Sequence, residues 1–170
     1  DRRIVAWFLR EAQITGQLDH PNIVPVHDVG VDTLGRLYFT MKLVGGETYA
    51  KRVRRMPAGP MSSSDVFDIL EIVVKVCDAM AFAHSRGVIH CDIKPQNVMV
   101  GSFGEVYVMD WGLARYSRGG GAHQKVSGSE QVTSSLDELD DCEVTGTPAY
   151  MAPEQARYGP LLLDYGHRGA

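Results

Sequence analysis

Apolar positions recur every three or four residues over residues 4–18, which predicts a helix with one buried face. Two later apolar stretches, residues 23–29 and 37–44, predict β-strands. Residues 32–35 between them read Asp-Thr-Leu-Gly, a turn composition, so the two strands should form a hairpin with Pro25 at an edge or a bulge. The inward positions of the helix are Val5, Phe8, Ala12, Thr15 and Leu18.

A second, longer helix is predicted after the serines at residues 62–64, because Ser and Asp are good N-cap residues and a long apolar stripe follows. Gly87 is typical of the position just beyond a helix end. The length of the stripe predicts that this helix is the most deeply buried one, with Cys77 as an inert core residue. The stripe consists of Val66, Ile69, Leu70, Val73, Cys77, Met80 and Ala81.

Shorter patterns complete the first two thirds of the chain. Short strands are predicted at residues 88–89, 98–100 and 106–109. A short helix over residues 48–56 carries a run of basic side chains, which can bind an acidic partner but is also typical of a solvated helix face, the interpretation that we favour. The basic residues are Lys51, Arg52, Arg54 and Arg55.

The composition changes over residues 116–143. Ser, Gly and Gln dominate its first part, and residues 127–143 contain six acidic residues and no Lys or Arg. Such a segment has too little apolar surface to order itself, which predicts a mobile loop. Residues 145–150 return to a turn-rich composition, and residues 161–170 show no clear element.

The bulk composition is that of a globular protein, with 44% hydrophobic and 22% charged residues in a chain of 170. A formal net charge of −4 gives no footprint for nucleic-acid binding. No apolar run approaches the roughly 20 residues that cross a bilayer, and we expect neither a membrane segment nor a signal peptide. Three widely spaced cysteines form neither a disulfide framework nor a zinc pattern, which favours a reducing, cytoplasmic location.

The chemistry is concentrated in residues 90–97. Asp92, Lys94 and Asn97 lie within six residues of one another, and Asp110 follows a short predicted hairpin. An acid can receive the proton of an attacking hydroxyl, and a lysine can lie against a transferring phosphate. Asn97 and Asp110 offer the oxygen ligands that Mg²⁺ requires. This set of groups predicts phosphoryl transfer.

Several motifs occur in an order that points to a known family. Residues 8–12 contain Glu11, residues 18–24 read Leu-Asp-His-Pro-Asn-Ile-Val, and residues 110–112 read Asp-Trp-Gly. Residues 151–154 read Met-Ala-Pro-Glu. With the catalytic-loop pattern of residues 90–97, they make residues 1–157 resemble the eukaryotic-like protein Ser/Thr kinases of bacteria. The resemblance implies an α+β, protein kinase-like two-lobe fold.

The resemblance implies a role for each matched residue. Asp92 would be the catalytic base, and Lys94 would contact the γ-phosphate and mark Ser/Thr specificity. Asn97 and Asp110 would be the Mg²⁺ ligands, while Glu11 would be the glutamate of the helix called αC in this family. The activation segment would contain Thr145 as the best candidate for autophosphorylation, Thr147 hydrogen-bonded near Asp92 and Lys94, and Glu154, which normally pairs with an arginine.

The resemblance also implies where ATP would bind. Met41 would be the gatekeeper at the back of the adenine pocket, and Met99 would form the pocket floor. The carbonyl of Lys42 and the N–H of Val44 would pair with the adenine edge. Residues 101–107 resemble a Gly-rich phosphate loop, but they follow Asn97 instead of preceding Glu11, so we expect a hairpin turn there.

The chain departs from the family pattern at its two ends. No Gly-rich loop and no Val-Ala-Ile-Lys strand precede Glu11, so we expect an incomplete domain in which residues 1–44 belong to the N-lobe and residues 45–170 to the C-lobe. Apolar faces should then be exposed. Cys91 replaces the arginine that usually precedes the catalytic aspartate, and Trp111 replaces the usual phenylalanine and should still pack against the helix that carries Glu11.

Two functions compete at this point. The first is an ATP- and Mg²⁺-dependent protein Ser/Thr kinase that acts on Ser and Thr of protein substrates. The second is a truncated or pseudokinase-like scaffold that binds partners without transferring phosphate. The four residues Asp92, Lys94, Asn97 and Asp110 favour the kinase, and the absence of a lysine partner for Glu11 favours the scaffold. A small-molecule phosphotransferase ranks third, because residues 146–154 resemble a peptide-binding segment.

Overall fold

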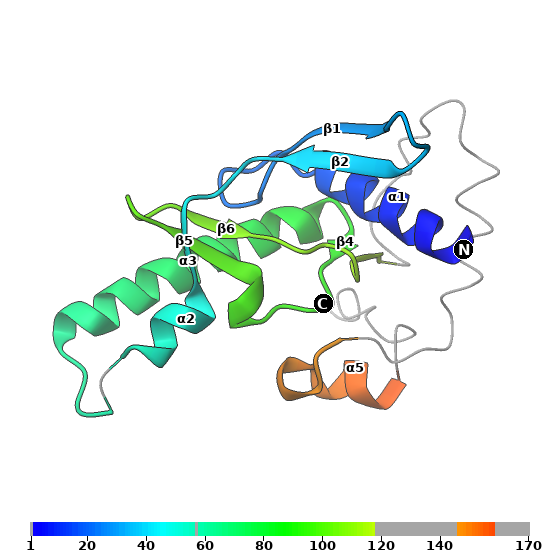
Figure 1. The fold of residues 1–170 in the computed structure, drawn as a ribbon. Coiled ribbons are helices and arrows are strands. Elements are labelled where there is room, and N and C mark those ends of the chain that lie inside the picture. Colours follow the sequence, from blue (N-terminus) through cyan, green and yellow to red (C-terminus); the bar gives the residue numbers. More distant parts are fainter. Residues whose placement is uncertain (1, 57, 118–145, 159–170) are drawn as a thin grey trace.

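The computed structural model describes residues 2–56, 58–117 and 146–158. Helices and strands alternate irregularly, in agreement with the α+β class expected from the sequence (Figure 1). The helices are α1 (Arg2–Gly16), α2 (Tyr49–Arg54), α3 (Ser63–Ser85) and α5 (Pro153–Tyr158). The strands are β1 (Val26–Val31), β2 (Leu37–Met41), β3 (Gly46–Thr48), β4 (Val88–Ile89), β5 (Val98–Gly101), β6 (Val106–Val108) and β7 (Arg115–Tyr116).

The hairpin β1–β2 covers helix α1 (Figure 1). Phe8 of α1 and Phe39 of β2 meet with ring centroids 5.0 Å apart. The Asp32 carboxylate closes the turn by accepting the N–H groups of Leu34 and Arg36, each at 2.9 Å, so the predicted hairpin is confirmed. The strands are shorter than predicted: β1 begins after Pro25, with a register shift in its first residues, and β2 ends at Met41.

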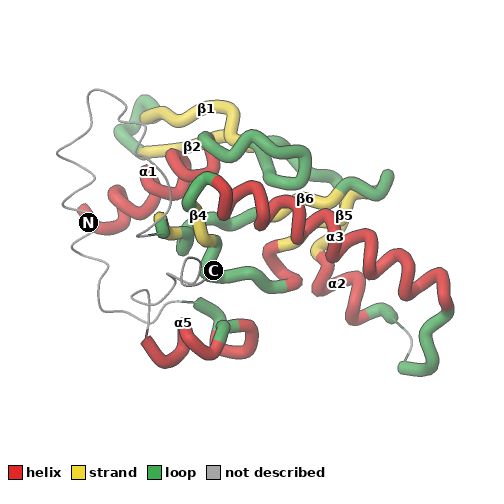
Figure 2. Tube along the Cα trace, turned by 180° about the vertical axis from the view of Figure 1, so that it is seen from behind, coloured by secondary structure: helices red, strands yellow, loops and turns green. Residues whose placement is uncertain are grey.

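The strands β3, β5 and β6 form a second antiparallel sheet, and α3 runs along it (Figure 2). Gly46 lies opposite Gly101 with a φ of 137°, and a Cβ at Gly46 would come within 2.2 Å of the Val100 carbonyl oxygen. The close approach of β3 to β5 therefore requires glycine. Thr48 then caps α2 through its side chain, which accepts the N–H of Lys51.

The turn between β5 and β6 is a hairpin turn, as expected from its position in the sequence. The N–H of Gly101 donates to the Glu105 carbonyl oxygen at 2.7 Å, and Gly104 adopts a φ of 81°. Phe103 at its tip is exposed. Residues 101–107 therefore close the ladder between β5 and β6.

Helix α3 begins and ends where the sequence predicts. Ser62 and Asp65 form a reciprocal capping box, which satisfies free N–H groups of the first turn. Gly87 follows the helix with a φ of 72°.

The prediction of which face of α3 is buried is wrong. The buried residues of the helix are Ile72, Ala79 and Ala83, whereas Cys77 is exposed and is no core residue. Ile69 and Met80 of the predicted stripe are half-buried. The other predicted stripe residues are exposed: Val66, Leu70, Val73 and Ala81.

The main core lies where α1, α3 and the strand β6 meet. Ile23, just before β1, pairs with Val108 of β6 as a parallel bridge, which joins the first part of the chain to the central hairpin. Trp111 is 1% exposed and belongs to the same cluster as Ile14 of α1, so its predicted packing is confirmed. The remaining members are Leu18, Ala79, Ala83, Val88 and Ala114.

A two-stranded pairing of β4 with β7 holds the chain after Trp111 next to the residues that directly precede His90. Tyr116 lies in β7, and the N–H of Ser117 donates to the Gly87 carbonyl oxygen at 2.7 Å. The predicted loop over residues 116–143 therefore begins two residues too early, and the rest of it lies outside the described residues.

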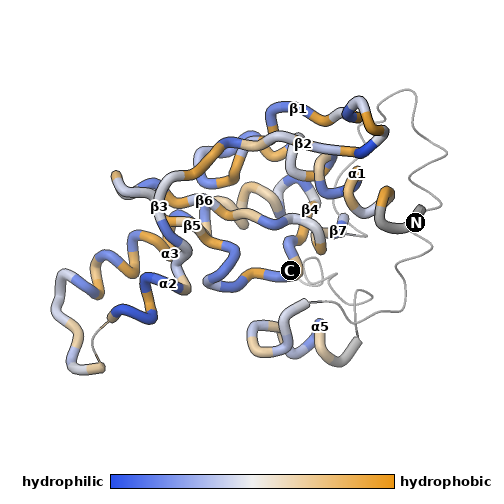
Figure 3. The backbone as a smooth tube through the Cα atoms, in the orientation of Figure 1, coloured by the Kyte–Doolittle hydropathy of each residue, from blue (hydrophilic) through white to orange (hydrophobic). Residues whose placement is uncertain are grey.

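Apolar and basic side chains both occur on the surface. Hydrophobic positions recur along α3, while most of α2 is hydrophilic (Figure 3). Phe67, Leu70 and Val74 of α3 are exposed, in agreement with the expectation of exposed apolar residues. Arg52 of α2 pairs with Asp68 at 3.1 Å, and Arg55 pairs with Glu47. These ion pairs support the interpretation that the basic face of α2 is solvated, with two of its arginines paired to acids of neighbouring segments of the same chain. Within the described residues, no helix is both long and apolar enough to span a bilayer.

Candidate active site

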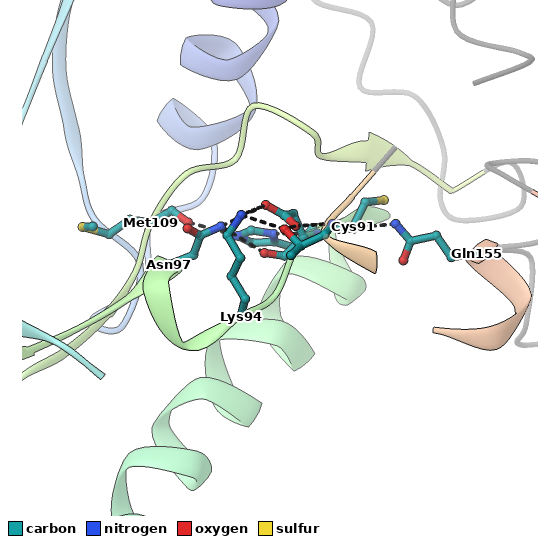
Figure 4. A network of polar contacts seen from close by, with 8 residues as sticks. Cys91, Lys94, Asn97, Met109 and Gln155 are labelled. Atoms are coloured by element: carbon teal, nitrogen blue, oxygen red, sulfur yellow. Dashed lines mark hydrogen bonds and ion pairs between the residues drawn. The ribbon is translucent and has the colours of Figure 1, made fainter. Parts of the chain in front are cut away.

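A buried histidine fixes the start of the catalytic loop. His90 is 1% exposed, and its ring lies 4.6 Å from that of Trp111. Its Nδ1 accepts the N–H of Asp92 at 3.3 Å, so its Nε2 carries the proton and donates to the Met109 carbonyl oxygen at 3.1 Å. Burial lowers the pKa of His90, which keeps the ring neutral in this pattern. His90 thereby ties the start of this segment to the chain before Asp110. Figure 4 shows Met109 and Asn97 in the same network of polar contacts.

Asp92, Lys94 and Thr147 form a closed triangle of hydrogen bonds. The ammonium of Lys94 donates to Asp92 Oδ2 at 2.6 Å and to the Thr147 hydroxyl at 2.8 Å. The Thr147 hydroxyl donates to Asp92 Oδ1 at 2.6 Å, and its N–H donates to the same oxygen at 2.9 Å. The contact predicted for Thr147 is confirmed. A segment 55 residues along the chain therefore completes the surroundings of Asp92.

The surroundings of Asp92 stabilise its charged form. Burial raises the pKa of Asp92, but hydrogen bonds from Lys94 and Thr147, together with the charge of Lys94, outweigh burial and lower it below the ordinary value. Asp92 is therefore ionised at neutral pH, with its two oxygens directed at different donors.

Asn97 and Asp110 are brought together by the backbone. The N–H of Met109 donates to the Asn97 carbonyl oxygen at 2.9 Å, which places the chain before Asp110 beside Asn97. The Asn97 amide nitrogen donates to the Asp92 carbonyl oxygen at 3.0 Å, so the amide oxygen is directed elsewhere. The side chain of Asp110 is exposed, and its backbone has a φ of 62°.

These two groups fit Mg²⁺ better than a transition metal. Within the described residues, no three His, Cys, Asp or Glu side chains gather into a metal site. Among the described hydrogen bonds, none uses the Asn97 amide oxygen, which remains available as a hard ligand together with the Asp110 carboxylate. Mg²⁺ is commonly bound by one or two protein oxygens and the phosphates of a nucleotide.

Glu11 of α1 lies close to the Asp-Trp-Gly turn. A Cβ at Gly112 would lie 3.2 Å from Glu11 Oε2, so this glycine permits the close approach. Burial raises the pKa of Glu11, and the nearby charge of Asp110 raises it further. Among the described residues, Glu11 makes no ion pair, and its predicted role stays a prediction.

Comparison with known proteins identifies the family. The protein kinase domain family matches residues 2–162, nearly the whole chain. The chain belongs to the protein kinase domain family. Serine/threonine-protein kinase PknD of Protochlamydia amoebophila is 34% identical over 165 residues, which cover 92% of this chain.

Proteins of the same name from Chlamydia trachomatis and Chlamydia caviae are 34% and 32% identical and cover 86% and 90% of the chain. The kinase chain spans 17% of the length of these relatives.

The residues expected at the adenine end of the kinase site lie on β2, on β5 and in the link to β3. Met41 is 41% exposed at the end of β2, and Met99 is half-buried in β5. The N–H of Lys42 donates to the Pro25 carbonyl oxygen at 3.0 Å, and its ammonium contacts the Tyr107 hydroxyl. None of the described backbone hydrogen bonds uses the Lys42 carbonyl or the Val44 N–H, so both remain available to a ligand. Their predicted roles stay predictions.

The activation-segment predictions divide between described and undescribed residues. Thr145 lies outside the described residues. Glu154 lies in the first turn of α5 and is half-buried, and within the described residues it makes no ion pair.

The structure adds one contact that the sequence analysis missed. Gln155, which directly follows Glu154, is buried and donates from Nε2 to the Cys91 carbonyl oxygen at 2.7 Å (Figure 4). The sequence alone does not reveal this contact. A single polar residue in a short helix belongs to no apolar pattern, so nothing in the sequence indicates that Gln155 is buried.

Proposed function

We propose that the chain is the catalytic part of a protein Ser/Thr kinase that transfers the γ-phosphate of ATP to hydroxyl groups of protein substrates. The observation that carries the proposal is the ionised Asp92 carboxylate, held 2.6 Å from the Lys94 ammonium and aimed by Thr147. A carboxylate and an ammonium at adjacent positions suit a reaction in which a proton leaves a hydroxyl while negative charge develops on phosphate.

In this mechanism, the substrate hydroxyl lies beside Asp92. Its oxygen attacks the γ-phosphorus, the bond from that phosphorus to the β,γ-bridging oxygen breaks, and the hydroxyl proton passes to Asp92. Lys94 stabilises the charge on the transferring group. The Thr147 hydroxyl, which already donates to Asp92 Oδ1 at 2.6 Å, supports a carboxylate that accepts an aliphatic hydroxyl.

Asn97 and Asp110 would hold Mg²⁺, which would neutralise charge on the phosphates and orient them. The Lys42 carbonyl and the Val44 N–H would hold the adenine edge, with Met41 behind it and Met99 below it. The names of the relatives support Ser/Thr specificity. The exposed thiol of Cys77 supports function in a reducing compartment such as the cytoplasm.

The test is phosphate transfer from radiolabelled Mg-ATP to a generic protein substrate, by the protein expressed from its complete reading frame. We expect labelled Ser and Thr, and Asp92→Asn should lower the rate about 100- to 10,000-fold. Asp28→Asn, an exposed acid on β1, is the matched control and should retain activity. Absence of transfer by the folded protein would contradict the proposal.

One observation favours the second function, binding without transfer. Glu11 has a raised pKa and makes no ion pair among the described residues. No described lysine is therefore held by Glu11 in a position to orient the α- and β-phosphates. A scaffold would show no increase in melting temperature with Mg-ATP and no transfer. A kinase should show both.

A further inference from the structure

The strongest unassigned contact joins α5 to the catalytic loop. Gln155 is 8% exposed, and its Nε2 donates to the Cys91 carbonyl oxygen at 2.7 Å, across 64 residues of chain. Cys91 directly precedes Asp92. The hydrogen bond joins two segments that are far apart in the sequence. Its length is that of a good hydrogen bond, so it restricts the orientation of the Cys91 peptide group.

Cys91 holds a backbone conformation that costs free energy. Its φ is 64°, in the left-handed region, where the Cβ of a non-glycine residue comes too close to the following carbonyl oxygen. Such a conformation persists only where neighbouring groups hold it in place. The hydrogen bond from Gln155 to the Cys91 carbonyl is one such restraint, and this peptide group leads into Asp92.

The space around this bond depends on a glycine. Gly146 has a φ of 137°, and a Cβ there would lie 2.8 Å from Gln155 Nε2 and 3.0 Å from the Cys91 carbonyl oxygen. Any side chain at residue 146 would push the donor and the acceptor apart. Gly146 also directly precedes Thr147, whose two hydrogen bonds reach Asp92 Oδ1.

We propose that Gln155 is a positioning residue: its amide holds the Cys91 carbonyl in place, keeps Cys91 in the left-handed conformation and thereby aims the Asp92 carboxylate. The proposal rests on the proposed phosphotransfer function. It assigns α5 a direct effect on the catalytic loop, since the segment from Gly146 to Gln155 contacts this loop at both of its ends. A neutral amide suits the role, because it donates a proton without adding a charge beside the Asp92–Lys94 pair.

The experiment compares wild type, Gln155→Leu and Gln155→Glu in the protein expressed from its complete reading frame. Leu keeps most of the volume and removes the donor, while Glu keeps the shape and places an acceptor against a carbonyl. We expect kcat to fall about 10- to 100-fold, with KM for Mg-ATP within about twofold of wild type. Gln13→Leu, the same change at an exposed position of α1, is the matched control and should leave kcat unchanged.

A second substitution separates positioning from general damage. Glycine adopts a positive φ without a Cβ penalty, so Cys91→Gly should restore part of the lost kcat in the Gln155→Leu background. Unchanged kcat in folded Gln155→Leu would overturn the proposal. A loss of kcat that tracks only a lower melting temperature, with no recovery by Cys91→Gly, would also overturn it.

Hydrogen exchange tests the same contact without any phosphotransfer. In Gln155→Leu, the amides of Asp92 and Thr147 should exchange faster than in wild type, while those of the β1–β2 hairpin should not change. If wild type transfers no phosphate but shows this local effect, the proposed function fails and the restraint on the loop stands. If the exchange of Asp92 and Thr147 is unchanged, the positioning role fails.

Discussion

Thr147 directs two hydrogen bonds at a single oxygen of Asp92, one from its hydroxyl at 2.6 Å and one from its N–H at 2.9 Å. The second oxygen of Asp92 accepts from the Lys94 ammonium at 2.6 Å and from the Asn97 amide nitrogen at 3.3 Å. The carboxylate is thus held from both sides and has no freedom to rotate without breaking a charge-assisted bond. The precision of the site depends on a residue far from the catalytic loop in the sequence.

Thr147→Val removes the hydroxyl and keeps the shape of the side chain. One hydrogen bond that lowers the pKa of Asp92 disappears, so this pKa should rise toward its ordinary value. Because the proposed phosphotransfer requires ionised Asp92, the acid limb of the kcat profile should move to higher pH, and kcat at neutral pH should fall about 10-fold or more. Steady-state kinetics from pH 5 to 8 measure both effects, and Thr147→Ser should keep most of the activity. An unshifted acid limb would contradict this assignment.

Glu11→Gln should stabilise the chain at neutral pH when no nucleotide is present. Burial and the charge of Asp110 raise the pKa of Glu11, so ionising it costs more in the folded than in the unfolded state. The gain should be complete above the folded pKa and should fade as the pH falls through the unfolded value of about 4.3, below which the carboxyl is neutral in both states. Urea unfolding at pH 7 and pH 4.5 measures the difference.

The control for Glu11 is Glu71→Gln on the exposed side of α3, which should change the free energy of unfolding by less than about 0.5 kcal/mol. A loss of stability in Glu11→Gln at pH 7 would show that a cation pairs with Glu11 in the protein tested.

Gly146→Ala and Gly104→Ala form a matched pair, because both glycines have a positive φ. A Cβ at Gly104 meets nothing within 4 Å, whereas one at Gly146 meets Gln155 and Cys91. We expect Gly104→Ala to cost about 1–2 kcal/mol and to leave kcat unchanged. Gly146→Ala should add about 1–3 kcal/mol of overpacking and should lower kcat at least about tenfold. Equal kcat values for the two variants would contradict the crowding described at Gly146.

Trp111→Phe should cost little stability although Trp111 is buried. Its Nε1 is the one buried side-chain polar atom that has no hydrogen-bond partner among the described residues. Phenylalanine loses part of the apolar contact but also removes this unpaired donor, whose burial costs about 1–3 kcal/mol. Thermal unfolding should show a change within about 1.5 kcal/mol, against about 3–5 kcal/mol for Trp111→Ala. A cost above about 3 kcal/mol for Trp111→Phe would indicate a bound water on Nε1.

The sequence predicted those features that depend on local chemistry. Ser62 caps α3, Gly87 follows its end, and Asp32 closes the hairpin turn, because each acts on backbone groups a few residues away. The contact of Thr147 with Asp92 was also predicted, but from a family resemblance and not from spacing.

The inward face of α3 could not be predicted in the same way. The helix has apolar residues on more than one side. The spacing of apolar residues shows that each of these sides could be buried, but it does not show which side packs against the sheet. The structure buries Ile72 together with Ala79 and Ala83, small residues that allow close packing, and leaves the larger Leu70 exposed. The contact of Gln155 with Cys91 was unpredictable for a related reason, since it depends on how two distant segments meet.

The separation of Asp92 from Thr147 along the chain also affects the order of folding. His90 and Met109 close a loop of 19 residues, whereas Asp92 and Thr147 close one of 55. Loop-closure entropy grows with the logarithm of length, so the longer closure costs about 1 kcal/mol more. We therefore expect residues 90–97 to dock beside the end of β6 early in refolding and the Thr147 segment to arrive last. A refolding chain would then regain most of its tertiary structure before Asp92 regains its hydrogen bonds from Thr147.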